Sequence, residues 1–197
     1  MSGGLALVTG AGRGTGRAVA LALGAAGARV AAVDVNPDAA ERTAGDIGAA
    51  ASAHTADVSN KMAVQTLLYG LLEAGERLIL LVNAAHVAPG SAALKMDEWE
   101  WNRTLDVNLK GVFLMSQTVA RAMKETGGGV ILNLLRPEDG RSAAVRAADA
   151  GLEGLTEALR AEWAAFGVRV EALPAAADPA QTAAEVVRRC ASLWKTA

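Results

Sequence analysis

Short apolar runs alternate with longer segments of helical pattern along almost all of this 197-residue sequence. The run Leu78–Asn83 carries no charged residue, as expected for a strand that is covered on both faces. This alternation is typical of parallel sheets, because two parallel strands need a crossover between them, usually a helix. We therefore expect a doubly wound, Rossmann-like α/β fold with helices on both faces of the sheet. Its six parallel strands should follow the order 3-2-1-4-5-6.

The positions of the strands and helices follow from the same pattern. The apolar runs predict strands over Leu5–Thr9, Arg29–Val35, Ala51–Val58, Leu78–Asn83, Val130–Leu134 and Val168–Leu173. The periodic segments predict helices over Arg17–Ala25, Pro37–Ile47, 60–72, 97–124, Ser142–Phe166 and Pro179–Trp194. No internal repeat or low-complexity linker interrupts the alternation. We expect residues 1–197 to form a single domain.

Composition and charge exclude several classes of protein. With 52% hydrophobic residues the chain is too apolar for a disordered protein. A net charge of −2 and the absence of a basic stripe give no support for a nucleic-acid partner. No apolar run approaches the ~18 residues of a membrane helix, and no charged segment typical of a secretory signal precedes the first strand. The one cysteine and two histidines argue against disulfides and metal sites, so we expect a cytoplasmic protein without metal.

A glycine-rich turn joins the first predicted strand to the first predicted helix. The segment Thr9–Gly16 reads TGAGRGTG. Glycines there allow positive φ angles and let the backbone approach a phosphate group closely. The helix that follows offers unpaired N–H groups and a partial positive charge at its start. The turn therefore predicts binding of a dinucleotide through its pyrophosphate.

Asp34 ends the second predicted strand, next to this turn in a Rossmann-like fold. A carboxylate at that point can accept hydrogen bonds from the ribose 2′-hydroxyl of NAD(H), and it would repel the 2′-phosphate of NADP(H). We therefore expect NAD(H) as the cofactor and NADP(H) as the less favoured one. Arg13 argues in the opposite direction, because its guanidinium could reach a 2′-phosphate.

These motifs together resemble the classical type of the short-chain dehydrogenase/reductase family over nearly the whole chain. Thr9–Gly16 matches the TGxxxGxG signature, Asp57-Val58 follows the third strand, and Asn83-Ala84-Ala85-His86 corresponds to NNAG with Ala84 and His86 as departures. Asp106–Gly111 resembles the motif that carries the family's catalytic Asn, at Asn108. The resemblance implies these cofactor-binding residues: Gly10, Arg13, Gly14, Thr15, Gly16, Asp34, Asp57, Val58, Asn83, Ala84 and Ala85.

The resemblance breaks at the family's catalytic Ser, Tyr and Lys. Arg136 stands at the Ser position, Val145 at the Tyr position and Asp149 at the Lys position. The only tyrosine, Tyr69, lies far from them in the sequence. Asn108 is then the one retained catalytic position. The chain also has too few residues after the sixth strand for the family's lid and last strand, so it resembles a catalytically degenerate, C-terminally shortened member.

Three functions follow as hypotheses. The first is a pseudoenzyme that binds NAD(H) without hydride transfer and acts as a binding, regulatory or structural subunit. The second is an active NAD-dependent oxidoreductase with non-standard groups, such as His86 or Asp149 as the acid, or with a site that a partner chain completes. The third is an assembly protein that no longer binds nucleotide, which Ala84 and His86 favour.

The resemblance also implies a partner. Relatives in this family usually dimerise through the two long helices that correspond to residues 108–124 and 142–166. Both segments keep small and apolar residues at helical spacing. We expect a homo-oligomer, specifically a dimer through these helices, or a heteromer with an active relative.

Overall fold

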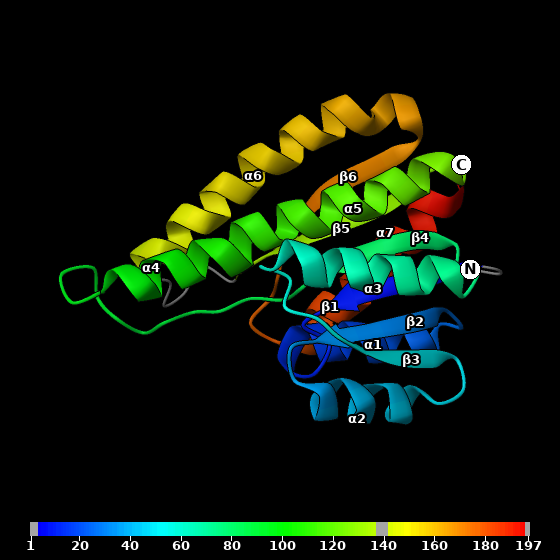
Figure 1. The fold of residues 1–197 in the computed structure, drawn as a ribbon, viewed down its shortest axis with the longest axis horizontal. Helices are drawn as coiled ribbons and strands as arrows, with labels where there is room; N and C mark the ends of the chain where they lie inside the picture. Colours follow the sequence, from blue (N-terminus) through cyan, green and yellow to red (C-terminus); the bar gives the residue numbers. More distant parts are fainter. Residues whose placement is uncertain (1–3, 137–141, 196–197) are drawn as a thin grey trace.

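A computed structural model describes residues 4–136 and 142–195, and Figure 1 shows the fold. Six parallel strands form one sheet in the order β3-β2-β1-β4-β5-β6. The strands are β1 (Leu5–Thr9), β2 (Arg29–Asp34), β3 (Ala51–Thr55), β4 (Leu78–Asn83), β5 (Gly129–Leu135) and β6 (Val168–Pro174). This order and the Rossmann-like architecture confirm the fold expected from the sequence. Whether residues 1–197 act as a single domain stays a prediction.

Helices cover both faces of the sheet. Their bounds are α1 (Gly14–Ala25), α2 (Pro37–Ile47), α3 (Lys61–Glu73), α4 (Glu98–Leu105), α5 (Val112–Glu125), α6 (Ala143–Trp163) and α7 (Pro179–Lys195). Two short helical turns, η1 (Asp106–Gly111) and η2 (Ala164–Phe166), extend α4 and α6. Helices α3, α5 and α6 pack on one face, and α1, α2 and α7 pack on the other.

Alternate residues of each central strand feed two separate cores. In β1, Leu5 and Leu7 pack with the α3 and α5 side, whereas Ala6 and Val8 pack with the α1 and α7 side. This follows from the two-residue period of a strand, which sends successive side chains to opposite faces. All five residues of β1 are buried, so the strand has no solvent-facing side. The central strands are fixed in position by packing on both sides.

Several element bounds differ from the sequence-based expectation, such as α1, which begins at Gly14 and not at Arg17, and two further differences concern the site. Strand β3 ends at Thr55 and not at Val58, because Asp57 turns back to accept hydrogen bonds from Ser59. The helix expected over 97–124 contains a wider π-helical turn over Asp106–Gly111. Such turns shift the register of a helix and often occur at functional sites. Here the turn carries Asn108.

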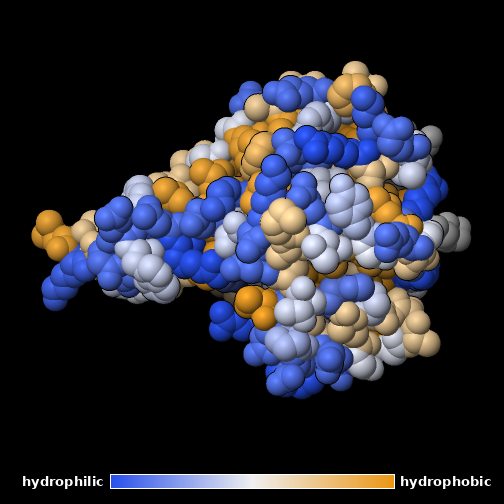
Figure 2. Space-filling model, in the orientation of Figure 1, coloured by the Kyte–Doolittle hydropathy of each residue, from blue (hydrophilic) through white to orange (hydrophobic). Residues whose placement is uncertain are grey.

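The segment around α4 projects from the body of the molecule, as Figure 2 shows at its left. A capping box starts this helix: the Asp97 side chain accepts from the Glu100 backbone N–H, and the Glu100 side chain accepts from the Asp97 backbone N–H. Within the described residues, no helix is both long and apolar enough to cross a membrane.

Candidate functional site

The glycine-rich turn between β1 and α1 forms the floor of the site. Gly10 has a φ of 65° and Gly14 a φ of 53°, which is the left-handed region that favours glycine. A Cβ atom on Gly16 would lie 2.2 Å from the Gly10 carbonyl oxygen, so only glycine fits there. Helix α1 begins at Gly14, and its first N–H groups have no partner inside the helix. The turn thus presents backbone donors and the positive end of a helix.

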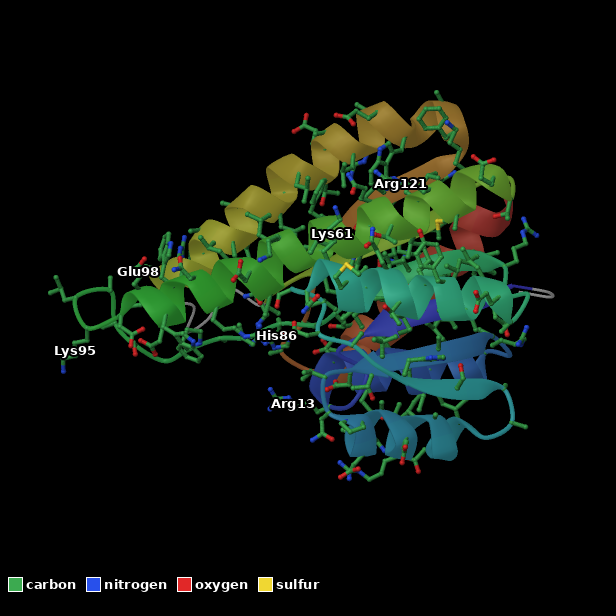
Figure 3. The ribbon with its side chains drawn as sticks, in the orientation of Figure 1. Arg13, Lys61, His86, Lys95, Glu98 and Arg121 are labelled. Atoms are coloured by element: carbon green, nitrogen blue, oxygen red, sulfur yellow. The ribbon has the colours of Figure 1, made fainter. Side chains whose placement is uncertain are left out.

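The end of β4 is held directly above this turn. The Thr9 hydroxyl accepts hydrogen bonds from the backbone N–H groups of Ala84 (3.1 Å) and Ala85 (3.2 Å). A Cβ on Gly10 would meet the Ala85 Cα at 2.6 Å, so the two backbones touch. This contact places His86, the next residue, at the edge of the turn. Figure 3 shows His86 and Arg13 on the same side of the sheet, and both line one cavity.

Asp34 lies at the end of β2, as expected, and its carboxylate is held by the backbone. One oxygen accepts from Gly12 N–H at 2.8 Å, and the other accepts from Asn36 N–H at 3.0 Å. These two bonds fix the carboxylate beside the glycine-rich turn. The side chain lines the same cavity as Gly10 and Gly14.

Asp57 forms a second fixed carboxylate in this cavity. It accepts hydrogen bonds from Ser59 and forms an ion pair with Arg103 at 3.2 Å. Burial raises the pKa of Asp57, but the Ser59 and Arg103 hydrogen bonds and the Arg103 charge outweigh it. The pKa of Asp57 therefore lies below its usual value. Sequence reasoning missed Arg103, because its partner Asp57 is distant in the chain and no local pattern connects them.

A cavity of about 270 Å³ connects these groups. A second cavity of about 470 Å³ adjoins it and shares the side chains of Arg13, His86, Val87 and Arg103. Most of the cofactor-binding residues expected from the sequence line the first cavity: Gly10, Arg13, Gly14, Thr15, Asp34, Asp57, Val58, Ala84 and Ala85. Gly16 and Asn83 do not line it: Gly16 packs against the Gly10 carbonyl, and the Asn83 amide donates to Asn133.

A buried chain of hydrogen bonds begins at the end of β4. The Asn83 amide donates to Ser116 (3.0 Å) and to Asn133 (2.8 Å), and Asn133 donates to Thr156 (2.9 Å). All four side chains are buried. Because satisfied buried polar networks are rigid, this one fixes β4 and β5 to α5 and α6.

His86 and Arg136 meet in the cavity wall. The His86 Nδ1–H donates to the Ala84 carbonyl at 3.1 Å, and the Nε2 atom accepts a hydrogen bond from an Arg136 N–H. A carbonyl only accepts and a guanidinium only donates, so the neutral ring carries its proton on Nδ1. Burial lowers the pKa of His86 below 6.5, and the charges of Arg136 and Arg13 lower it further.

Asn108 holds the chain next to this histidine. Its side-chain oxygen accepts from Val87 N–H and its amide donates to the Val87 carbonyl, both at 2.8 Å. Asn108 is 5% exposed and does not line the cavity itself. In this structure it is a positioning residue for the segment that carries His86. The catalytic role expected for Asn108 stays a prediction.

The three residues expected at the Ser, Tyr and Lys positions separate into two groups. Arg136 lines the cavity beside His86. Val145 and Asp149 are both buried in α6 and do not line that cavity. Of the two acids that the sequence offered, His86 and not Asp149 therefore reaches the cavity.

The geometry fits a nicotinamide dinucleotide. A Cβ built on Gly14 would meet nothing within 4 Å, so the space over the start of α1 is open to phosphates. Asp34 and Asp57 supply acceptors at one end of the cavity, and the His86–Arg136 pair stands at another part of its wall. Ligand pockets usually enclose about 300–1,000 Å³, a range that the two adjoining cavities together reach.

Comparison with known proteins gives consistent results. The family profile described as short chain dehydrogenase matches residues 4–189. The chain is 38% identical to D-threitol dehydrogenase of Mycolicibacterium smegmatis over 180 residues, which cover 88% of this chain and 69% of that enzyme. It is 35% identical to a 3-oxoacyl-[acyl-carrier-protein] reductase of Synechocystis over 178 residues, covering 86% and 72% of the two chains.

Solved structures agree with these matches. A metagenomic short-chain oxidoreductase in complex with NADP superposes with a TM-score of 0.88 at 32% identity, covering 95% of this chain and 90% of the other.

The pseudoenzyme hypothesis is wrong in light of these findings. Relatives named as active dehydrogenases and reductases match most of the chain, which supports an oxidoreductase. The hypothesis treated the altered positions as an inactivated site. The structure instead brings His86 and Arg136, from β4 and β5, into contact in the cavity wall. Groups able to move a proton and to stabilise negative charge are therefore present.

Proposed function

The chain belongs to the short chain dehydrogenase family, and we propose that it is a nicotinamide-dependent oxidoreductase that interconverts a secondary alcohol and a carbonyl compound. One observation carries this proposal. The His86–Arg136 pair lines the same cavity as the glycine-rich turn and the Asp34 carboxylate. A proton-transfer group, a cation and a dinucleotide cradle therefore share one site.

Each of the two residues has a role that its chemistry favours. The bound nicotinamide ring supplies the chemistry of hydride exchange. In alcohol oxidation, the substrate hydroxyl replaces Arg136 at the His86 Nε2 atom, whose lone pair then takes the hydroxyl proton. Arg136 stabilises the negative charge that develops on the substrate oxygen. A depressed His86 pKa keeps the ring neutral, and ready to accept a proton, at neutral pH.

The proposed substrates are small polyhydroxy compounds. Several relatives are named for such substrates, including D-threitol dehydrogenase and galactitol 2-dehydrogenase, the latter of Cereibacter sphaeroides. Both relatives are 38% identical to this chain over 88% of its length. The further side of the site, lined by Val87, Pro89 and Trp99, offers space beyond His86 for a substrate.

The proposed cofactor is NAD(H). Asp34 supports it, since its fixed carboxylate suits a ribose hydroxyl and repels a 2′-phosphate. NADP(H) is a second candidate on specific grounds. Arg13 lines the cavity as an exposed cation, and the superposed metagenomic oxidoreductase holds NADP.

We propose a homodimer through residues 108–124 and 142–166. A hollow of about 320 Å³ lies between the two segments and is lined by Phe113, Leu159 and Trp163. Phe166, the last residue of the second segment, is 42% exposed. Heteromer formation with an active relative and a cytoplasmic location also remain predictions.

The test measures NAD(H)- and NADP(H)-linked turnover with a panel of polyols and ketoses. We expect turnover by the wild-type protein, and a loss of about 10²- to 10⁴-fold in kcat for His86→Asn with cofactor binding retained. His54→Asn is the matched control, because His54 lies on β3 away from the cavity. Absence of turnover across the panel, or equal effects of the two histidine variants, would reject the proposal.

A further inference from the structure

The Asp57 carboxylate keeps one acceptor position for a ligand. Its Oδ1 atom accepts hydrogen bonds from the Ser59 backbone N–H at 2.9 Å and from the Ser59 hydroxyl at 2.6 Å. Its Oδ2 atom accepts from an Arg103 Nη1–H at 3.2 Å. A carboxylate has about four lone-pair positions, so contacts among the described residues leave one of them, on Oδ2. The Asp57 side chain is 35% exposed and lines the cavity, so a ligand can reach that position.

Apolar side chains line the same cavity as this carboxylate. Ala56 and Val58 are the neighbours of Asp57 in the chain, and Val107 comes from η1. Val35 adds a fourth, directly after β2, and is 61% exposed. A flat apolar ring with a hydrogen-bond donor on its edge suits an apolar wall with one acceptor. The adenine of a nicotinamide dinucleotide has this form, because its exocyclic amine donates hydrogen bonds.

Arg103 reaches this carboxylate from a different element. It lies on α4, and its Nη1 atom also donates to the Ser59 hydroxyl at 2.9 Å. The η1 turn that follows α4 packs closely on the segment after β3, since a Cβ on Gly111 would lie 2.9 Å from Val58 Cγ2. Ser59 binds only the Oδ1 atom of Asp57. Among the described residues, the Arg103 bond is therefore the contact that sets the direction of Oδ2.

We propose that Arg103 is a positioning residue for recognition of the cofactor's base, because it holds the remaining acceptor position of Asp57 where the exocyclic amine of adenine can donate to it. This inference rests on the proposed function, since it requires a bound dinucleotide, and it adds a specificity-determining residue on α4. Although burial raises the pKa of Asp57, the Ser59 and Arg103 hydrogen bonds and the Arg103 charge hold it below its usual value. The carboxyl is therefore an ionised acceptor at neutral pH, and a base with a carbonyl oxygen in place of the amine cannot donate to it from that position.

The first experiment compares two reduced dinucleotides that differ only in the base. NADH carries adenine, and reduced nicotinamide hypoxanthine dinucleotide carries a carbonyl oxygen in place of the amine. Titration of the nicotinamide fluorescence gives both dissociation constants, with the corresponding 2′-phosphates used if the protein prefers NADPH. For the wild-type protein, the Kd of the hypoxanthine compound should be about tenfold higher or more, as expected for one lost hydrogen bond to a charged group. Equal affinity for the two compounds overturns the inference.

Variants of Arg103 test the positioning role. Arg103→Met removes the charge and the donors, so the ratio of the two dissociation constants should fall to about threefold or less. Arg103→Lys should restore part of the ratio, because an ammonium group can still donate to Oδ2. Lys110→Met is the matched control, since Lys110 lies on the adjoining η1 turn, pairs with Asp106 and lines neither cavity. Equal losses of affinity for both dinucleotides in Arg103→Met would place Arg103 on the phosphates and overturn the inference.

Two further measurements separate positioning from a merely structural role. Reduced nicotinamide mononucleotide has no adenine, so Arg103→Met should leave its affinity unchanged, and a parallel loss of that affinity overturns the inference. In Asp57→Ala the base preference should already be lost, and adding Arg103→Met should not change it further, because Arg103 acts through Asp57. A further change in the double variant also overturns the inference. Dinucleotide binding without base preference overturns the positioning role alone, whereas no binding of any reduced nicotinamide compound to the wild-type protein rejects the proposed function as well.

Discussion

The cavity has a proposed nucleotide end, around the glycine-rich turn and Asp34, and a proposed catalytic end, around His86 and Arg136, and the fold builds the two ends differently. At the nucleotide end, β1, the glycine-rich turn and α1 are consecutive in the chain, and Asp34 is fixed by the backbone of that same turn. At the catalytic end, His86 follows β4 and Arg136 follows β5, with two helices between them in the sequence.

This difference shows how the two ends tolerate change. The nucleotide end depends on backbone conformations that only glycine supplies, so its sequence is constrained position by position. The catalytic end needs only that polar side chains of suitable chemistry reach the same point. A family member can therefore change its catalytic groups while its dinucleotide cradle stays the same.

The largest expected effect tests the backbone constraint at the nucleotide end. Gly16→Val should abolish dinucleotide binding, because its Cβ would lie 2.2 Å from the Gly10 carbonyl oxygen and would displace the turn. Isothermal titration with NADH and NADPH measures the loss. The control is Gly70→Val, an exposed helical glycine with nothing within 4 Å of its Cβ. Retained binding in Gly16→Val would show that the turn can open.

The next effect tests the positioning of the catalytic end. Asn108→Ala removes both hydrogen bonds to Val87, so the segment carrying His86 should loosen and the ring should gain water. We expect kcat to fall by about 10-fold, which is less than the roughly 10²- to 10⁴-fold loss expected for removal of an acid–base group. The His86 pKa should rise toward 6.5. NMR titration of the two histidines checks the second outcome.

Asn60→Ala is the matched control for this change. Asn60 caps the start of α3, so its loss should lower stability and leave the His86 pKa unchanged. If Asn108 had only a structural role, Asn108→Ala would also lower stability but would leave the His86 pKa unchanged. An unchanged His86 pKa in Asn108→Ala would contradict the positioning role.

A smaller effect concerns cofactor choice at the nucleotide end. Asp34→Ala removes the carboxylate that would accept from a ribose hydroxyl and repel a 2′-phosphate. The ratio of the NADP(H) dissociation constant to that of NAD(H) should fall by about 10-fold, which corresponds to one charge-assisted hydrogen bond. Fluorescence titration of NADH and NADPH gives both constants. If the wild-type protein already binds NADPH more tightly, Asp34 does not select the cofactor.

The smallest expected effect is the pH dependence of stability at the catalytic end. The folded-state pKa of His86 lies below 6.5, so below pH 6.5 the unfolded chain binds a proton more readily than the folded chain. Stability should therefore rise with pH from below the folded pKa up to about 6.5. His86→Asn should remove this part of the dependence. Thermal unfolding of both proteins between pH 5 and pH 8 tests it, and identical profiles would exclude the effect.

The sequence by itself determined the architecture and the nucleotide end. Strand positions follow from apolar runs that must be covered on both faces, and the turn follows from glycines placed between a strand and a helix. The positions of Asp34 and Asp57 were predictable for the same reason, since parallel strands end at one edge of the sheet. Local patterns carry this information because backbone conformation depends mainly on neighbouring residues.

Only the tertiary structure decided which polar groups meet at the catalytic end. His86 and Arg136 belong to different crossover units, and so do Asp57 and Arg103, so no local spacing predicts either contact. Likewise, burial in α6 and not residue type keeps Asp149 out of the cavity wall. Side chains distant in sequence come together through the twist of the sheet and the packing of its helices, which act on the whole chain at once.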